Sequence, residues 1–153
     1  MPLTRRDVLL AGVLTVTTAA CTSISEPAPQ APPDPDISLR GAAIVRERTL
    51  LVAYDAALIA HPSLRATLAP LRADHATHLD RLTGQLPGTP APAADPTPPS
   101  APPATAAGQR AALRALERST QAAHRDAAIT ASRVLAPVLA SLAACEASHA
   151  VVL

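Results

Sequence analysis

The chain is almost free of large aromatic side chains: it has no tryptophan and no phenylalanine, and Tyr54 is its only tyrosine. A hydrophobic core must therefore be built from leucine, valine, isoleucine and alanine. Small aliphatic side chains suit closely packed helices, whereas strands are enriched in aromatic and β-branched residues. The composition thus predicts an all-α protein.

Lysine is also absent, and the 13 basic residues, all arginine, are balanced by 12 acidic residues. Such a balance provides no basic surface, which argues against a nucleic-acid partner. No glycine-rich phosphate loop and no Gly-x-Ser-x-Gly turn is found, so the usual signals of nucleotide binding and serine hydrolysis are missing. After residue 20 no apolar stretch reaches the length of about 18 residues that a membrane span needs.

The N-terminus has the layout of an export signal. Arg5 and Arg6 precede a short apolar run, and small residues then lead to Cys21, which predicts a signal peptide over residues 1–20. The arginine pair resembles the twin-arginine motif of bacterial export, and Cys21 resembles the lipidated cysteine of bacterial lipoproteins. This resemblance implies an exported protein, anchored through lipidated Cys21 to the extracytoplasmic face of the cell membrane. Ordinary cleavage near Ala20 would instead release a soluble protein, and a signal that is not cleaved would itself remain as an anchor.

Proline-rich stretches divide the rest of the chain into segments. Residues 21–36 are expected to form a proline-rich tether, and residues 85–106 a disordered, exposed connection. Between and after them, apolar residues recur at three- and four-residue steps. These patterns predict four helices, over residues 37–60, 62–84, 107–129 and 133–151. Asp36 or Ser38 would cap the first helix, and Pro70 would kink the second or separate a short turn from it.

Two helical hairpins joined by one long connection predict a four-helix bundle over residues 37–153. The 85–106 segment is long enough to run the length of the bundle, which favours the ferritin-like arrangement with a single crossover.

Ionisable residues share the apolar face of every predicted helix. The candidate metal ligands are Glu47, His75, His78, Glu117, Glu146 and His149. Residues three apart lie on one face of a helix, so the carboxylate of Glu146 and the imidazole of His149 can reach a common ion.

This order of residues resembles the ferritin-like di-iron and di-manganese carboxylate proteins, in which two helices each give one Glu and two give Glu-x-x-His. The resemblance implies iron or manganese as cofactor. The second helix departs from the pattern, because it reads His75-Ala76-Thr77-His78. Only three carboxylates are then well placed, with Asp74 at the edge of the face. Such a set would hold one Zn, Mn or Fe ion, a skewed pair, or none.

Two functions follow. In the first, the chain resembles actinobacterial twin-arginine lipoproteins with a ferritin-like domain: an envelope binding or scaffolding module whose metal site is degenerate or lost, with the histidines and glutamates bonded to one another. In the second, it is a metal-binding redox or metal-handling protein. A fourth inward carboxylate would favour the second. Among the other polar groups, Tyr54 is expected to fill the core or make a hydrogen bond, Cys145 to be a small buried hydrophobe, and His61 and His124 to be exposed or at the boundary.

Overall fold

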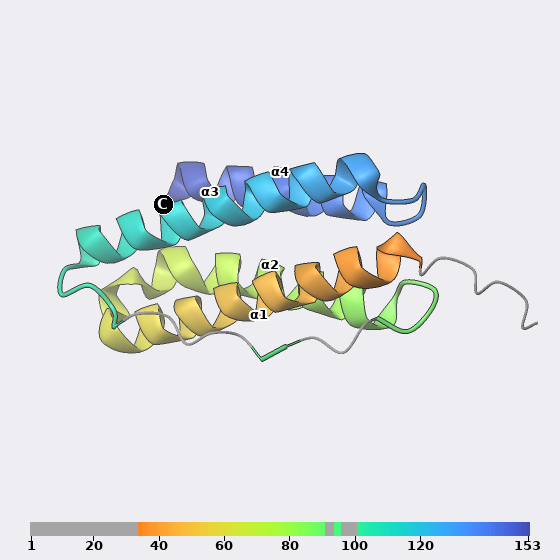
Figure 1. The fold of residues 1–153 in the computed structure, drawn as a ribbon. Coiled ribbons are helices and arrows are strands. Elements are labelled where there is room, and N and C mark those ends of the chain that lie inside the picture. The colour runs from red at the N-terminus through yellow and green to blue at the C-terminus, as the bar shows by residue number, and fades with distance from the viewer. Residues whose placement is uncertain (1–33, 91–93, 96–100) are drawn as a thin grey trace, which may run out of the picture. The chain divides into compact units, whose positions relative to one another are not determined.

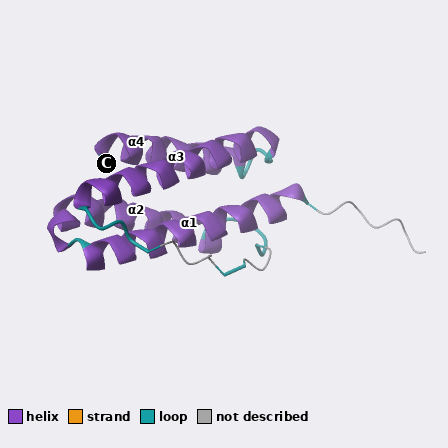
Figure 2. Cartoon of the chain, turned by 60° about the vertical axis from the view of Figure 1, so that its left-hand side comes forward, coloured by secondary structure: helices purple, strands orange, loops and turns teal. Residues whose placement is uncertain are grey.

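The computed structural model describes residues 34–90, 94–95 and 101–153. The predicted signal peptide, the export arginines Arg5 and Arg6, the lipidation residue Cys21 and most of the tether lie outside the described residues. Within them the chain is helical and has no strands (Figure 2). The helices are α1 (Pro35–Ala60), α2 (Arg65–Gly84), α3 (Ala106–Thr130) and α4 (Ala136–Val152).

The helices pack as a four-helix bundle of two antiparallel hairpins (Figure 1). Near the start of α1, the guanidinium of Arg40 donates to the carbonyl of Leu82 near the end of α2. At the other end of α1, His61 Nε2 lies 2.8 Å from the carbonyl oxygen of Pro103, just before α3. Helices α2 and α3 therefore run parallel, and the connection between them starts at one end of the bundle and finishes at the other. This is the single-crossover connectivity that the sequence predicts.

The start of α1 differs slightly from the prediction. The helix begins at Pro35 because the Asp34 side chain caps it, accepting from the backbone N–H of Asp36 at 3.0 Å. Neither Asp36 nor Ser38 is the cap. Asp36 instead accepts a hydrogen bond from the backbone N–H of Ser132 at 2.9 Å, which ties this end of α1 to the turn between α3 and α4.

The start of α2 also differs from the prediction. A separate 3₁₀ turn, Pro62–Leu64, precedes α2, and Pro70 lies inside the continuous helix rather than at its break. The break falls at the proline that follows His61 because a residue before proline avoids the helical conformation. The end of α2 at Gly84 agrees with the prediction.

The described ends of the proline-rich connection make specific contacts with the bundle. The Arg40 guanidinium donates to the carbonyls of Pro87 and Gly88 at 2.9 and 2.8 Å. Gly88 has φ +76°, a left-handed conformation that glycine adopts without steric cost. At the far end, the Thr105 side chain caps α3. Residues 91–93 and 96–100 lie outside the described part.

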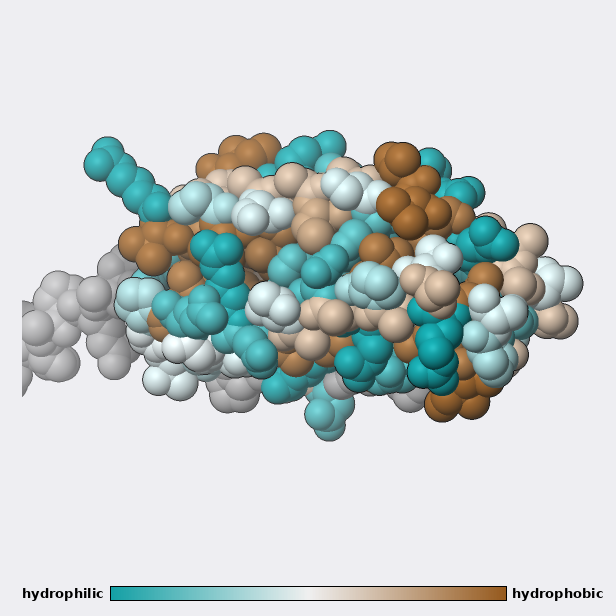
Figure 3. All heavy atoms as spheres, turned by 180° about the vertical axis from the view of Figure 1, so that it is seen from behind, coloured by the Kyte–Doolittle hydropathy of each residue, from teal (hydrophilic) through white to brown (hydrophobic). Residues whose placement is uncertain are grey.

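The core consists of two apolar clusters. One comprises Leu50, Ala53, Tyr54, Ala57, Leu64, Leu68, Leu71, Leu113 and Leu153. The other comprises Ala43, Ile44, Leu82, Leu135, Val138, Leu139 and Leu142. On the surface, Figure 3 shows several separate hydrophobic groups set among hydrophilic and neutral residues. Within the described residues, no helix combines the length and the apolar character needed to cross a membrane.

Candidate metal centre

A layer of buried polar side chains lies between the two apolar clusters. It contains all six residues predicted from the sequence and one more, and every helix contributes to it: Glu47, His75, His78, Glu117, His124, Glu146 and His149. Only His78 in this layer has an appreciably exposed side chain, at 14%. We refer to these seven residues as the polar layer.

His75 lies at the centre of the polar layer, between two carboxylates. Its Nδ1 is 2.9 Å from Glu47 Oε2 and its Nε2 is 2.8 Å from Glu117 Oε1. A carboxylate only accepts, so both ring nitrogens must donate and the imidazole is protonated. Burial alone would lower the pKa of His75, but the two carboxylates outweigh it and raise the pKa to about 9. His75 is therefore a buried cation at neutral pH.

The two carboxylates respond in the opposite direction. Burial would raise the pKa of Glu47, but hydrogen bonds and charge from His75 and His78 lower it to about 2. The pKa of Glu117 falls to about 2 in the same way, against burial, through His149, His75 and Tyr54. Both carboxylates are ionised at neutral pH, and one imidazolium links them.

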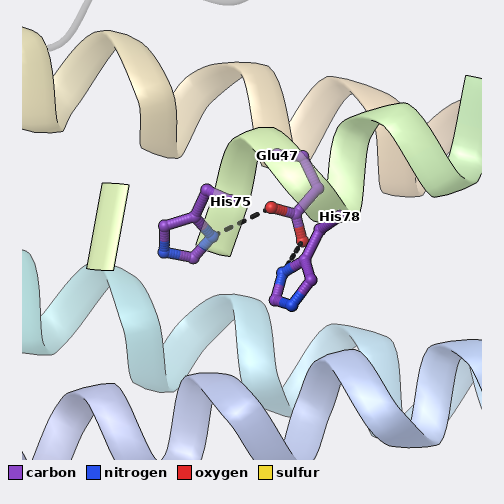
Figure 4. Close-up of side chains that lie close together, drawn as sticks. All are labelled: Glu47, His75 and His78. Carbon is purple, nitrogen blue, oxygen red and sulfur yellow. Dashed lines mark hydrogen bonds and ion pairs between the residues drawn. The ribbon is translucent and has the colours of Figure 1, made fainter. Parts of the chain in front are cut away.

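Glu47 presents one oxygen to each histidine of α2, as Figure 4 shows. Oε2 bonds His75, while Oε1 lies 3.5 Å from His78 Nδ1. That second distance belongs to an ion pair but makes no hydrogen bond, and both Oε1 and Nδ1 are buried without a hydrogen-bond partner.

His124 is fully buried in α3, so the sequence-based prediction of an exposed or boundary residue is wrong. Its Nδ1 lies 2.8 Å from Glu146 Oε1. Leu113, Glu117, Thr120 and His124 follow one another at steps of four, three and four and are all buried. That spacing in the sequence indicates that His124 faces inward. A prediction that places Ala123 on the inward face at this turn is wrong by one residue.

Glu146 differs from the other two carboxylates. Burial raises its pKa, His124 opposes that effect, and the charges of Glu47 and Glu117 add to the rise. Three carboxylates packed in one layer repel one another, and Glu146 is the one on which this repulsion acts.

Tyr54 is more than core filler. Its hydroxyl donates to Glu117 Oε1 at 2.5 Å, and its ring lies against His75 with the centroids 5.3 Å apart. Burial, followed by the charge and hydrogen bond of Glu117, raises the pKa of Tyr54 above its usual value. The phenol therefore stays protonated and remains a donor to the carboxylate.

His149 connects the polar layer with its outer edge. Its Nδ1 lies 3.3 Å from Glu117 Oε1, and its Nε2 lies 3.2 Å from Asp74 Oδ2 and 3.3 Å from Cys145 Sγ. The Asp74 side chain is 54% exposed, so it reaches His149 from outside and does not supply the fourth inward carboxylate. Cys145 is half-buried and contacts a polar partner, contrary to the expectation of a plain buried hydrophobe.

Unpartnered polar atoms concentrate in the polar layer. Six buried side-chain nitrogen or oxygen atoms of the described residues have no hydrogen-bond partner, and one of them, Gln109 Oε1, lies outside the layer. The other five are Glu47 Oε1, His78 Nδ1, Glu117 Oε2, His124 Nε2 and Glu146 Oε2. Buried polar groups nearly always have a hydrogen-bond partner. Five unpartnered atoms in one layer therefore indicate that the layer needs a binding partner other than its own side chains.

Comparison with known proteins gives no assignment: no protein-family model, no curated protein and no solved structure matches the chain.

Proposed function

We propose that the protein is an exported, lipid-anchored envelope protein of ferritin-like architecture whose bundle binds one divalent transition-metal ion. The ligands are Glu47, His78, His124 and Glu146. A single observation carries this proposal: each of these residues has a buried ligand atom without a hydrogen-bond partner, and each comes from a different helix.

Glu47 belongs to two groups of potential ligands. With His124 and Glu146 it offers ligand atoms that all lie within 4.8 Å of one another, and with His75 and His78 it forms a second such group. His78 Nδ1 is 3.5 Å from Glu47 Oε1, so Glu47 is the residue that would connect His78 to a cation held by the first group. Two ligands bound at about 2.1 Å to a tetrahedral ion lie about 3.4 Å apart. A cation between these atoms would satisfy them, whereas leaving each unpaired costs about 1–3 kcal/mol.

The chemistry of the ligand set also fits. Two carboxylates and two imidazoles neutralise one divalent ion, and these ligands suit zinc, iron(II) and manganese. A bound cation would also stabilise the ionised form of Glu146, against the effect of its burial. The apolar clusters on both sides would shield the ion from water.

One ion is favoured over the pair of a di-iron or di-manganese protein. A second ion would need the fourth carboxylate that the family pattern places at the position of His75. In this chain that position holds a protonated imidazole between Glu47 and Glu117. A histidinium ion thus supplies positive charge where the second metal would otherwise be.

Elemental analysis tests the proposal. Protein purified from medium replete with zinc, iron and manganese should contain at least one equivalent of metal. Glu146→Gln and His124→Gln should each lower the metal content by about one equivalent, while Asp126→Asn, an exposed carboxylate on α3, should leave it unchanged. X-ray absorption should show nitrogen and oxygen ligands, including imidazole.

A second candidate function is the metal-free envelope module. The bridging of Glu47 and Glu117 by His75 favours it, because this bridge neutralises part of the layer without any ion. In that case the wild-type protein would fold fully, contain no metal, and show the same melting temperature with and without a chelator. That result would overturn the metal proposal and direct attention to a protein partner in the envelope.

A further inference from the structure

A second group of metal-binding side chains lies outside the four proposed ligands. Asp74 on α2 faces Cys145 and His149 on α4, and their ligand atoms all lie within 4.8 Å of one another. His149 Nε2 is 3.2 Å from Asp74 Oδ2 and 3.3 Å from Cys145 Sγ. Carboxylate, thiol and imidazole thus converge on one point at the edge of the polar layer.

This group differs in access from the polar layer. The Asp74 side chain is 54% exposed, Cys145 is half-buried, and the His149 side chain is only 4% exposed. The three side chains therefore range from exposed at the carboxylate to buried at the imidazole.

His149 turns one ring nitrogen inward and the other outward. Its Nδ1 lies 3.3 Å from both Glu117 Oε1 and His75 Nε2, and in the tautomer with a proton on Nδ1 it donates a hydrogen bond to the ionised Glu117 carboxylate. A histidine ligand commonly donates its other ring N–H to a carboxylate, which fixes the tautomer and makes the ligating nitrogen more basic. In this tautomer Nε2 carries the lone pair, and Nε2 is the nitrogen that faces Asp74 and Cys145.

We propose that Asp74, Cys145 and His149 form a separate, solvent-accessible site for a borderline-soft divalent cation such as zinc, distinct from the Glu47, His78, His124 and Glu146 site. A thiolate, an imidazole and a carboxylate are typical zinc ligands, and the thiolate disfavours hard ions such as magnesium or calcium. Together Asp74 and the thiolate neutralise a divalent ion. A water molecule would complete the coordination of such an ion.

The metal-free thiol provides a clean background for a spectroscopic test. When a cation binds, Cys145 would ligate it as the thiolate, and the thiol proton would leave to solvent. Thiolate-to-metal charge-transfer absorption therefore reports this site alone, since the other proposed site has no sulfur ligand.

The experiment is a cobalt(II) titration of the purified full-length protein, stripped of metal and kept reduced. We expect thiolate-to-cobalt charge-transfer absorption that saturates and is displaced by zinc. Asp74→Asn should weaken cobalt binding at this band at least roughly tenfold. Asp80→Asn, which changes an exposed carboxylate on the same helix, should have no effect. Cys145→Ser should abolish the band while the helical circular dichroism persists.

The two proposals fail separately. No charge-transfer band at saturating cobalt, or a band that Asp74→Asn leaves unchanged, would overturn the outer site. In Glu146→Gln the band should persist, because this substitution removes none of the three ligands of the outer site. A thiolate band in a protein whose elemental analysis shows no metal lost on Glu146→Gln would leave the outer site standing and overturn the buried one.

Discussion

His75 connects two carboxylates of the polar layer. With both nitrogens donating to Glu47 and Glu117, the protonated ring bridges α1 and α3 from its position on α2. Both nitrogens of the buried imidazole are satisfied, whereas Glu47 and Glu117 each keep one oxygen without a hydrogen-bond partner. Truncating His75 would leave two buried anions facing each other.

The pH dependence of stability should report this bridge in the metal-free protein. The pKa of His75 rises from 6.5 to about 9 on folding, so its contribution is complete below pH 6.5 and is lost as pH rises through 9. Glu47 and Glu117, with pKa lowered from 4.5 to about 2, contribute fully above pH 4.5 and lose this contribution as pH falls towards 2. Stability should therefore be greatest between these limits.

Chemical denaturation at a series of pH values, with a chelator present, measures this dependence. The matched variant is His75→Gln, which keeps a polar side chain but cannot be protonated. His75→Gln should be less stable than the wild type at pH 6. Its stability should also decline less above pH 6.5, and the decline that remains comes from the other titrating groups, which both proteins share. Parallel pH profiles for the two proteins would contradict the assignment of a buried imidazolium.

Tyr54 allows a second test at the residue scale. Tyr54→Phe keeps the ring against His75 but removes the donor to Glu117, whose other oxygen is already unpartnered. We expect a loss of about 1–3 kcal/mol in the free energy of unfolding, measured by urea denaturation. Thr49→Val removes a hydroxyl that bonds only a carbonyl of its own helix, and should change stability by less than about 0.5 kcal/mol. Equal effects of the two substitutions would argue against a special role for the tyrosine.

At the scale of the elements, apolar periodicity predicts the helices well and the rotation of one helix poorly. The alanine-rich sequence of α3 offers several adjacent small residues, so its inward face can be drawn through Ala123 or through His124. Alanine gives little hydrophobic contrast between faces, and packing against α4 decides the phase. That is why five of the polar-layer residues on the other helices, and Glu117, follow from the sequence while His124 does not.

The connection after α2 yields a paired prediction about glycine. Gly88→Ala places a side chain at φ +76° and should cost about 1–2 kcal/mol of stability, although the added Cβ meets no atom within 4 Å. Gly84→Ala also meets nothing within 4 Å but lies in helical backbone, so it should be neutral or slightly stabilising. Thermal melts of the two variants compare them directly. A destabilised Gly84→Ala beside a neutral Gly88→Ala would contradict the described turn.

For the whole molecule, composition and the distribution of prolines suffice to predict the topology. With two short turns and one long proline-rich connection, only a bundle with one crossover lets both hairpins bury their apolar faces. Which polar residues face the core and which partners they bond could not be predicted in the same way. Whether Asp74 turns inward, and whether His75 bonds one carboxylate or two, depends on side-chain geometry within a layer only a few ångströms across.

Localisation is a property of the whole chain and is tested there. Replacing both Arg5 and Arg6 by lysine should block export if the twin-arginine route is used, and the protein should remain in the cytoplasm. Cys21→Ala should leave export intact but move the protein from the membrane fraction to the soluble fraction. Fractionation with immunodetection of the full-length chain measures both effects. A Cys21→Ala protein that has lost its signal peptide and still remains in the membrane fraction would contradict anchoring through a lipid.

The layer between the two apolar clusters divides its proposed ligands equally between the hairpins: Glu47 and His78 belong to the first, and His124 and Glu146 to the second. Each hairpin alone is a bidentate half-site with an exposed apolar face. Cutting the chain within residues 91–100 would therefore produce two fragments that bind each other both through hydrophobic contacts and through a shared ion. The two fragments would form a metal-dependent complementation pair. The cation would determine which fragments associate and in which register.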